Sequence, residues 1–252
     1  MGIAVVNENL SGIMMLFFLA GFWQWLKNNI WLASLFFALA FSTKFHVLIA
    51  ILGVFAGTPK KSMLPYLMYF VIMVIGINLP ILWNNGFTNL LESIKLFSQV
   101  FEFNGGIYQI FKWLGYKITG YNTIAFNGKL LLLIFCVVYS ILLIKSFKSS
   151  KNLLIYTCLA WSCYLFLATT VHPWYVIPIL VIGLLKNLKF PIVWSFLVVG
   201  SYLAYKPGYV SENIWVVLGL YLLLFGFIFW EFTQKQQNRV SYQHTTQKQS
   251  VK

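Results

Sequence analysis

Long apolar segments, separated by short polar turns, run through most of this sequence. Eight of them have the composition of a membrane span: about Gly12–Leu26, Trp31–Gly57, Met63–Trp83, Leu130–Ile144, Leu153–Thr169, Trp174–Leu185, Pro191–Tyr205 and Ile214–Trp230. A helix needs roughly 20 apolar residues to cross a hydrocarbon core about 30 Å thick. The pattern therefore predicts an all-α, polytopic bundle of transmembrane helices with about eight spans.

The second apolar segment is interrupted by Ser42-Thr43-Lys44-Phe45-His46. Two interpretations stay open. A single long span would put Lys27 on the outer side of the membrane. Two short helices hinged at Lys44 would go out and back, and would keep Lys27 in the cytoplasm.

Residues 84–128 form a long mixed segment between two spans. Apolar residues recur there at helical spacing, first at Leu90, Ile94, Phe97 and Phe101, and then at Ile107, Ile110, Phe111, Leu114 and Ile118. This spacing predicts two amphipathic helices on the outer membrane surface, one on either side of the break at Asn104-Gly105-Gly106. A segment of this length is usually functional in a compact protein.

The positions of the lysines orient the spans, because basic residues concentrate in cytoplasmic loops. Four groups agree with strict alternation and are assigned to the cytoplasm: Lys60-Lys61; Lys145, Lys148 and Lys151; Lys186 and Lys189; and the tail with Lys235 and Arg239. The mixed segment, the turn at Thr170–Trp174 and the turn at Tyr205–Asn213 then fall on the outer face. Four lysines contradict this assignment: Lys95, Lys112, Lys117 and Lys206.

Composition supports a membrane protein. Of the 252 residues, 60% are hydrophobic and only 9% are charged, against about 25% charged in soluble domains. We expect one multi-spanning domain over residues 1–231 and a disordered cytoplasmic tail over residues 232–252, which is too polar to bury a core.

The net charge of +13 could indicate nucleic-acid binding, but most lysines lie in turns between apolar segments, so we expect no nucleic-acid partner. The three cysteines lie inside apolar segments without metal-ligand spacing. We therefore expect no disulfide framework, no metal site and no cofactor.

The most informative short stretch is Thr169-Thr170-Val171-His172-Pro173-Trp174-Tyr175. Proline disfavours helix in the residue before it, so His172 is expected at a helix break near the outer interface. A structural role is the simpler interpretation, because Trp174 and Tyr175 are typical of an aromatic belt. The functional hypothesis is that His172 binds or protonates a phosphate or a sugar near the lipid headgroups.

Lys44 is a second candidate, because a charge within an apolar segment is by default a functional hypothesis. The structural alternative is that its side chain extends to the interface. If two short helices meet at Lys44, it faces the outer side together with His172, where a lipid-linked phosphate could bind.

Glu92 and Glu102 lie in the mixed segment, and paired carboxylates can perform acid and base catalysis. On surface helices such residues more often form solvated ion pairs with neighbours such as Lys95, and this second interpretation is the one that we favour. No phosphate-binding glycine loop, nucleophile elbow, HExxH or CxxC motif occurs in the sequence.

Several stretches resemble bacterial polyprenol-phosphate-mannose-dependent mannosyltransferases, which belong to the GT-C superfamily. The fairly specific stretches are the outer segment from Asn89 to Phe97, running on through Phe101-Glu102-Phe103-Asn104, and Ala168–Tyr175 (ATTVHPWY). Weaker ones are Ala38–Lys44 (ALAFSTK), Thr119–Asn122 (TGYN) and the region from Ser201 to Asn213. The resemblance covers nearly the whole chain up to Trp230.

The resemblance implies a multi-pass enzyme of the bacterial inner membrane. Such an enzyme transfers a sugar, here mannose, from a polyprenyl-phosphate donor to a glycan or glycolipid acceptor at the outer face. By position, His172 and Lys44 would line the donor site with Trp174 and Tyr175 at its rim. Glu102, in the resembling outer segment, would also contact substrate. No catalytic residue is assigned.

The sequence departs from the family at its front. Family members have a first span and a large outer loop that supplies an acidic residue suited to act as general base, and this chain has no aspartate. We expect a C-terminal portion: a fragment, a mis-started reading frame or one half of a split protein. Catalysis would then depend on the missing N-terminal part.

Two other classes of function stay open. A transporter or flippase of a lipid-linked glycan would also need cationic groups facing a membrane cavity. Transporters often contain inverted repeats with matching broken helices, and only one lysine-broken segment is visible, which favours the enzyme. The third possibility is a membrane scaffold subunit without chemistry.

Overall fold

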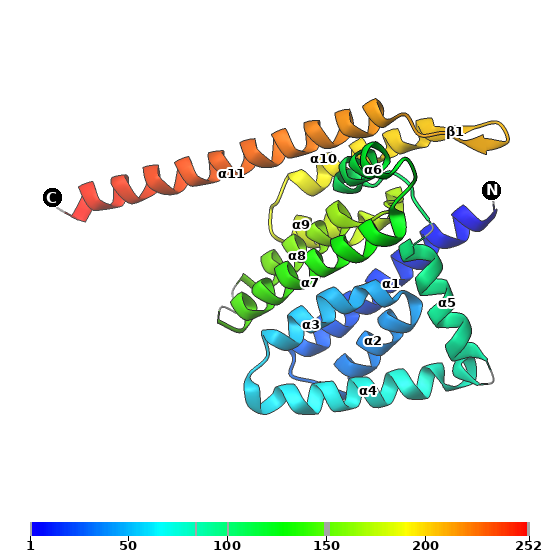
Figure 1. The fold of residues 1–252 in the computed structure, drawn as a ribbon. Helices are drawn as coiled ribbons and strands as arrows, with labels where there is room; N and C mark the ends of the chain where they lie inside the picture. The colour runs from blue at the N-terminus through cyan, green and yellow to red at the C-terminus, as the bar shows by residue number, and fades with distance from the viewer. Residues whose placement is uncertain (1, 84, 100, 149–151, 251–252) are drawn as a thin grey trace.

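The protein is almost entirely α-helical, as predicted, and the only strands among the residues described form one small hairpin (Figure 1). The computed structural model describes residues 2–83, 85–99, 101–148 and 152–250. The elements of the first half are α1 (Gly2–Leu26), α2 (Ile30–Thr43), the short 3₁₀ helix η1 (Phe45–Val47), α3 (Leu48–Ala56), α4 (Lys60–Leu82), α5 (Gly86–Gln99) and α6 (Gly106–Thr119). The second half contains α7 (Ile124–Lys148), α8 (Leu153–Leu167), η3 (Pro173–Tyr175), α9 (Ile177–Leu185), α10 (Phe190–Leu197), η4 (Val198–Ala204), β1 (Tyr205–Lys206), β2 (Tyr209–Val210) and α11 (Ile214–Ser250).

Three of the described helical stretches are long and apolar enough to cross a membrane: Lys60–Ile81, Ile124–Lys148 and Ile214–Gln236. Six shorter apolar stretches accompany them: Leu10–Leu26, Ile30–Thr43, Phe45–Ala56, Leu153–Leu167, Pro173–Leu185 and Phe190–Ala204. At a rise of about 1.5 Å per residue, a 15-residue helix covers only about 22 Å. The fold is therefore that of a helical bundle compatible with a membrane, in which long and short apolar helices are mixed.

The second apolar segment is two helices, and the single long span is wrong. Lys44 has an extended backbone (φ −152°, ψ 118°) and ends α2. Ser34, early in α2, donates to the carbonyl of Tyr66, early in α4, at 3.2 Å. At the other end of the same pair, Asn78 donates to Ser42 at 2.7 Å. Because α2 and α4 are parallel, α3 has to return between them, which makes Lys44 the hinge.

Figure 1 separates the two ends of the bundle. One end, which we call the hairpin end, carries the start of α1, the β1–β2 hairpin and α5. The opposite end, which we call the lysine end, carries the turn before α4, the end of α7 and the C-terminus of α11. Of the lysines assigned to the cytoplasm by sequence, Lys60 begins α4 and Lys148 ends α7, so both lie at the lysine end. Two of the four that contradicted the assignment have local partners: Lys112 pairs with Glu102, and Lys117 lies over the Trp113 ring.

The two predicted amphipathic helices of the mixed segment are α5 and α6. The break between them falls at the predicted position, since Asn104 has a positive φ of 50° and α6 begins at Gly106. Gly106 is needed for packing, because a Cβ atom there would lie 2.6 Å from the ring of Tyr221. The missing side chain lets α6 approach α11.

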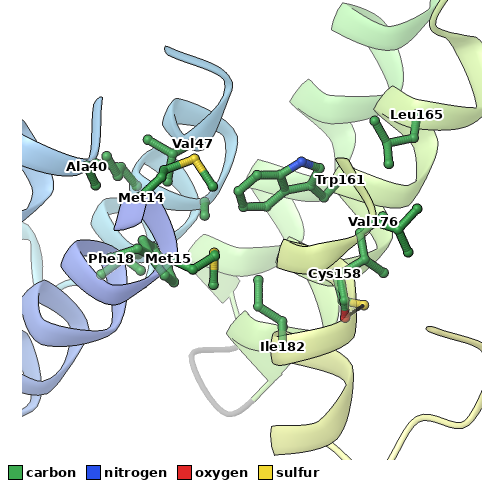
Figure 2. Packing of buried hydrophobic residues seen from close by; sticks show 14 of the residues in the cluster. Met14, Met15, Phe18, Ala40, Val47, Cys158, Trp161, Leu165, Val176 and Ile182 are labelled. Carbon is green, nitrogen blue, oxygen red and sulfur yellow. Dashed lines mark hydrogen bonds between the residues drawn. The ribbon is translucent and has the colours of Figure 1, made fainter. Parts of the chain in front are cut away.

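Apolar packing joins the helices α1 to α3 to the helices α8 and α9. In Figure 2, the Trp161 side chain of α8 lies between Met14 and Val47 on one side and Val176 on the other. Trp161, Met14 and Val47 are all completely buried. The large indole therefore fills the seam between the two groups of helices.

The last helix, α11, does not end where its apolar stretch ends but continues into the polar tail. In the structure α11 continues as one helix to Ser250, and Figure 1 shows this part extending away from the bundle. The segment was expected to be disordered, and disorder in solution stays a prediction for residues 232–252.

Candidate functional site

The site begins where the mixed segment docks against the chain leaving α8. Phe103 donates its backbone N–H to Thr169 O at 3.1 Å, and Val171 donates to Phe103 O at 2.7 Å. These bonds form a short parallel bridge between Phe103 and Thr170. The extended backbone is local in origin, because His172 precedes Pro173 and has φ −80° and ψ 153°. The predicted helix break at His172 is confirmed.

His172 is held between two aromatic rings. Its imidazole stacks on Phe103 with a centroid distance of 4.9 Å and on Trp174 at 4.5 Å, and it meets Tyr175 edge to face at 5.5 Å. Burial, and then the charge of Lys44, lower the pKa of His172 to about 4. The ring is therefore neutral near pH 7, and it would contact a ligand through hydrogen bonds rather than through charge.

Lys44 reaches the same cluster from α2. Its ammonium donates to Ser11 Oγ of α1 at 2.7 Å and lies 5.5 Å from the centroid of the Tyr175 ring. Since His172 also meets the Tyr175 ring, Lys44 and His172 both contact Tyr175. Because a lysine is cationic and His172 is neutral, Lys44 supplies the positive charge that an anionic ligand would need.

His46 completes this cluster and was not predicted as a site residue. It follows Lys44 by two positions and its ring lies 5.8 Å from Tyr175, centroid to centroid. The sequence contained the signal, since His46 lies in the polar interruption that marked the hinge. We name the group Lys44, His46, His172, Trp174 and Tyr175 the cationic–aromatic cluster.

Glu102 sits one residue before Phe103 and has three polar partners. Lys112 binds it at 2.6 Å, the Tyr108 hydroxyl donates to it at 2.5 Å, and Asn122 donates at 3.3 Å. Burial alone would raise the pKa of Glu102, but the hydrogen bonds from Lys112 and Tyr108 and the charge of Lys112 bring it below its ordinary value. Glu102 is therefore a stable carboxylate, saturated by its own protein.

Glu212 is the second carboxylate of this region, and sequence reasoning missed it as a site residue. It accepts a hydrogen bond from the backbone N–H of Asn104 and another from Gln109 Nε2 at 3.2 Å. Burial raises the pKa of Glu212 above its ordinary value, although these two bonds and the charge of Lys112 oppose the shift. Two carboxyl groups whose pKa values are displaced in opposite directions are typical of acid and base roles.

A signal for Glu212 was present in the sequence. Lysine placement put both outer loops on one face, and these loops contain Glu102 and Glu212. The hypothesis paired Glu102 with Glu92 instead. In the structure Glu92 is exposed on α5, whereas the negative charge of Glu102 contributes to raising the pKa of Glu212.

The structure thus brings four of the predicted residues, Lys44, His172, Trp174 and Tyr175, into one cluster. Glu102 lies beside it through Phe103, in a separate hydrogen-bond network. Trp174 is buried with 6% of its surface exposed, so it packs under His172 rather than standing at an open rim. Across the described part of the chain, no three His, Cys, Asp or Glu side chains group closely enough to hold a metal ion.

Comparison with known proteins identifies no relative: no family model, no curated protein and no solved structure matches the chain. The chemistry of the site therefore rests on its own geometry.

Proposed function

We propose that this chain is a membrane-embedded glycosyltransferase that takes mannose from a polyprenyl-phosphate donor at the hairpin end of the bundle. The acceptor is a glycan or glycolipid, the membrane is the bacterial inner membrane, and the hairpin end faces outward. One observation carries the proposal. Lys44 and His172, on two separate breaks in apolar helices, converge on Tyr175, with two carboxylates of opposite pKa displacement alongside.

In this proposal Lys44 binds the donor phosphate, because an ammonium compensates the negative charge that a phosphate brings into a poorly hydrated site. Neutral His172 donates a hydrogen bond to the phosphate or the sugar. The bond between the sugar's anomeric carbon and the phosphate oxygen breaks, and polyprenyl phosphate leaves with the electron pair. A bond forms from that carbon to an acceptor hydroxyl, whose proton passes to Glu212.

Glu212 suits the base role better than Glu102. Three donors already saturate Glu102, and the resulting low pKa makes it a weak base. The pKa of Glu212 is raised, which brings a carboxylate nearer to the working pH. Glu102 then positions Tyr108 and Lys112 at the edge of the site.

The test is a transfer assay in membranes that contain the protein, with radiolabelled polyprenyl-phosphate mannose as the donor. We expect His172→Ala and Lys44→Met to abolish transfer, and Glu92→Gln, on the exposed face of α5, to leave it intact. Unchanged transfer by His172→Ala would remove His172 from the site. Movement of the intact donor between leaflets without sugar release would replace the enzyme with a flippase.

A further inference from the structure

The seam that η1 and α3 form with α8 contains three buried polar atoms for which the described residues provide no hydrogen-bond partner. They are Nε2 of His46, Nε1 of Trp161 and Oγ1 of Thr157. Trp161 is completely buried, and Thr157 has only 2% of its surface exposed. An unsatisfied buried polar group costs about 1–3 kcal/mol, so three in one seam require an explanation.

The three atoms belong to one neighbourhood. The His46 and Trp161 rings meet edge to face with their centroids 5.6 Å apart. Thr157 lies one helical turn before Trp161 on α8, which puts both side chains on the same face. Across that face a Cβ atom at Gly53 of α3 would lie 2.8 Å from Thr157 Oγ1. Residue 53 therefore has to be small for the backbone of α3 to approach the Thr157 hydroxyl.

The stripe is continuous with the cationic–aromatic cluster. His46 packs against Tyr175 at 5.8 Å and stacks on Tyr164 at 6.4 Å, centroid to centroid. Tyr175 in turn contacts Lys44 and His172. Ring contacts thus run from Tyr175 to His46 and from His46 to Trp161.

The chemistry of the atoms defines what they bind. Trp161 Nε1 can only donate, whereas His46 Nε2 accepts when the ring proton is on Nδ1. Thr157 Oγ1 does both. A hydroxyl oxygen both accepts and donates, and it has to be small to fit among aromatic walls. With the His46 proton on Nδ1, an anion would lack the donor that Nε2 needs, and an ammonium would lack the acceptor that Trp161 needs.

We propose that His46, Trp161 and Thr157 form a buried hydroxyl-binding pocket that extends inward from the cationic–aromatic cluster. Its occupant is either a hydroxyl group of the donor sugar or a water molecule held in the bundle. The sugar alternative rests on the proposed function, and the water alternative does not. Both satisfy the same atoms, since a buried water usually makes two to four hydrogen bonds to otherwise unpaired groups.

Two substitutions remove the nitrogen atoms and keep an aromatic ring at each position: His46→Phe and Trp161→Phe. Thermal unfolding of the two variants and of the double variant gives a cycle. If one oxygen bridges the two nitrogens, the two losses of melting temperature are not additive. The double variant then melts about 2–4 °C higher than the temperature expected from adding the two single losses. Trp194→Phe is the matched control, because Trp194 is a buried indole that stacks on Phe166 in another part of the bundle.

Binding assays then identify the occupant, with polyprenyl-phosphate mannose and polyprenyl phosphate as the two probes. A sugar hydroxyl predicts that either Phe variant binds the sugar-bearing lipid about tenfold more weakly and the bare phosphate unchanged. Non-additive melting with unchanged binding of both lipids supports the pocket with water as its occupant. Additive melting together with unchanged binding overturns the pocket. If the wild type binds neither lipid, the proposed function fails, and the melting cycle still decides the pocket.

Discussion

The ammonium of Lys44 lies 5.5 Å from the centroid of the Tyr175 ring, so the hinge between α2 and η1 touches the 3₁₀ helix that follows α8. A lysine over an aromatic face gains about 0.5–1 kcal/mol when exposed and about 2 kcal/mol when desolvated. The contact, with the bond to Ser11, fixes the ammonium beside His172. Charge and aromatic surface are thus assembled before any ligand arrives.

Lys44 should therefore control affinity for an anionic lipid. Lys44→Met should weaken binding of polyprenyl phosphate about 10- to 100-fold, since hydrogen bonds to charged groups contribute about 1.5–3 kcal/mol. Lys44→Arg should recover part of this loss by keeping the charge. The measurement is titration of the lipid into protein in nanodiscs.

Lys27→Met is the matched control for this experiment. Lys27 also lies over an aromatic ring, 4.9 Å from Trp23, but it follows the last residue of α1, whereas Ser11 lies in the middle of that helix. Its removal should leave lipid affinity unchanged. Equal losses from both variants would show that the lipid responds to net charge rather than to the cluster.

The helices were predictable because apolar periodicity records burial directly. Helical spacing located α5 and α6 and the break at Asn104. The hinge at Lys44 could be seen as an interruption, but not as a reversal. The reversal depends on Ser34 and Asn78 bonding α2 to α4, and such tertiary pairing leaves no periodic signal along a chain.

Site residues could be predicted where a polar residue interrupts an otherwise apolar segment. Lys44 and His172 are polar groups at breaks in apolar segments, and both lie in the cluster. Glu212 lies in a polar loop, where a carboxylate is not unusual. Its significance comes from the backbone N–H of Asn104, which reaches it only because Phe103 pairs with Thr170.

Glu212 should impose a pH dependence on sugar transfer. A base acts only when ionised, and burial raises the pKa of Glu212, so transfer should fall on acidification at a higher pH than an ordinary carboxylate would dictate. Glu212→Gln should lower transfer about 10²- to 10⁴-fold and remove this limb of the pH profile. If the residual activity of Glu212→Gln keeps the same acidic limb, that limb belongs to another group. The control Glu92→Gln should change neither the rate nor the pH profile.

The Glu102–Lys112 pair should stabilise the docked outer segment. The atoms are 2.6 Å apart and both side chains are about one-quarter exposed, at 26%, so the coupling energy should be about 1 kcal/mol or less. Because the pKa of Glu102 is below its ordinary value, this stability is complete above the ordinary carboxyl pKa and is lost as pH falls through the lowered one.

A double-mutant cycle of Glu102→Gln and Lys112→Met, measured by unfolding in detergent at neutral and acidic pH, checks that prediction. Lys117→Met is the control on the same helix, since its ammonium lies over Trp113 at 4.3 Å. Coupling of equal size at both pH values would contradict an ionic origin.

Gly106 should be intolerant of any side chain. Gly106→Ala would bring Cβ to 2.6 Å from the Tyr221 ring, and overpacking of this kind costs about 1–3 kcal/mol. The melting temperature should fall by about 2–4 °C for each kcal/mol. The loss should be smaller in a Tyr221→Leu background, where the opposing ring is absent.

Gly219→Ala provides the comparison for Gly106, because a Cβ atom at Gly219 would meet nothing within 4 Å. Alanine is the better helix former, so this variant should melt at the same temperature as the wild type or higher. If both glycine variants lose stability equally, the approach of α6 to Tyr221 is not what Gly106 permits.

The orientation of the two ends can be tested independently of any lipid. Ser211→Cys follows the β1–β2 hairpin, and Lys189→Cys lies between α9 and α10 on the lysine end; both positions are exposed. The background should replace the native cysteines, since Cys136 is exposed. In intact bacterial cells a membrane-impermeant maleimide should label Cys at position 211, and it should label position 189 only after permeabilisation. Lysines favour the cytoplasmic side, and this pattern would place the cationic–aromatic cluster where an outward-facing donor can reach it. The reverse pattern would put Lys44 and His172 on the inner leaflet and leave an outward-facing transferase without a site.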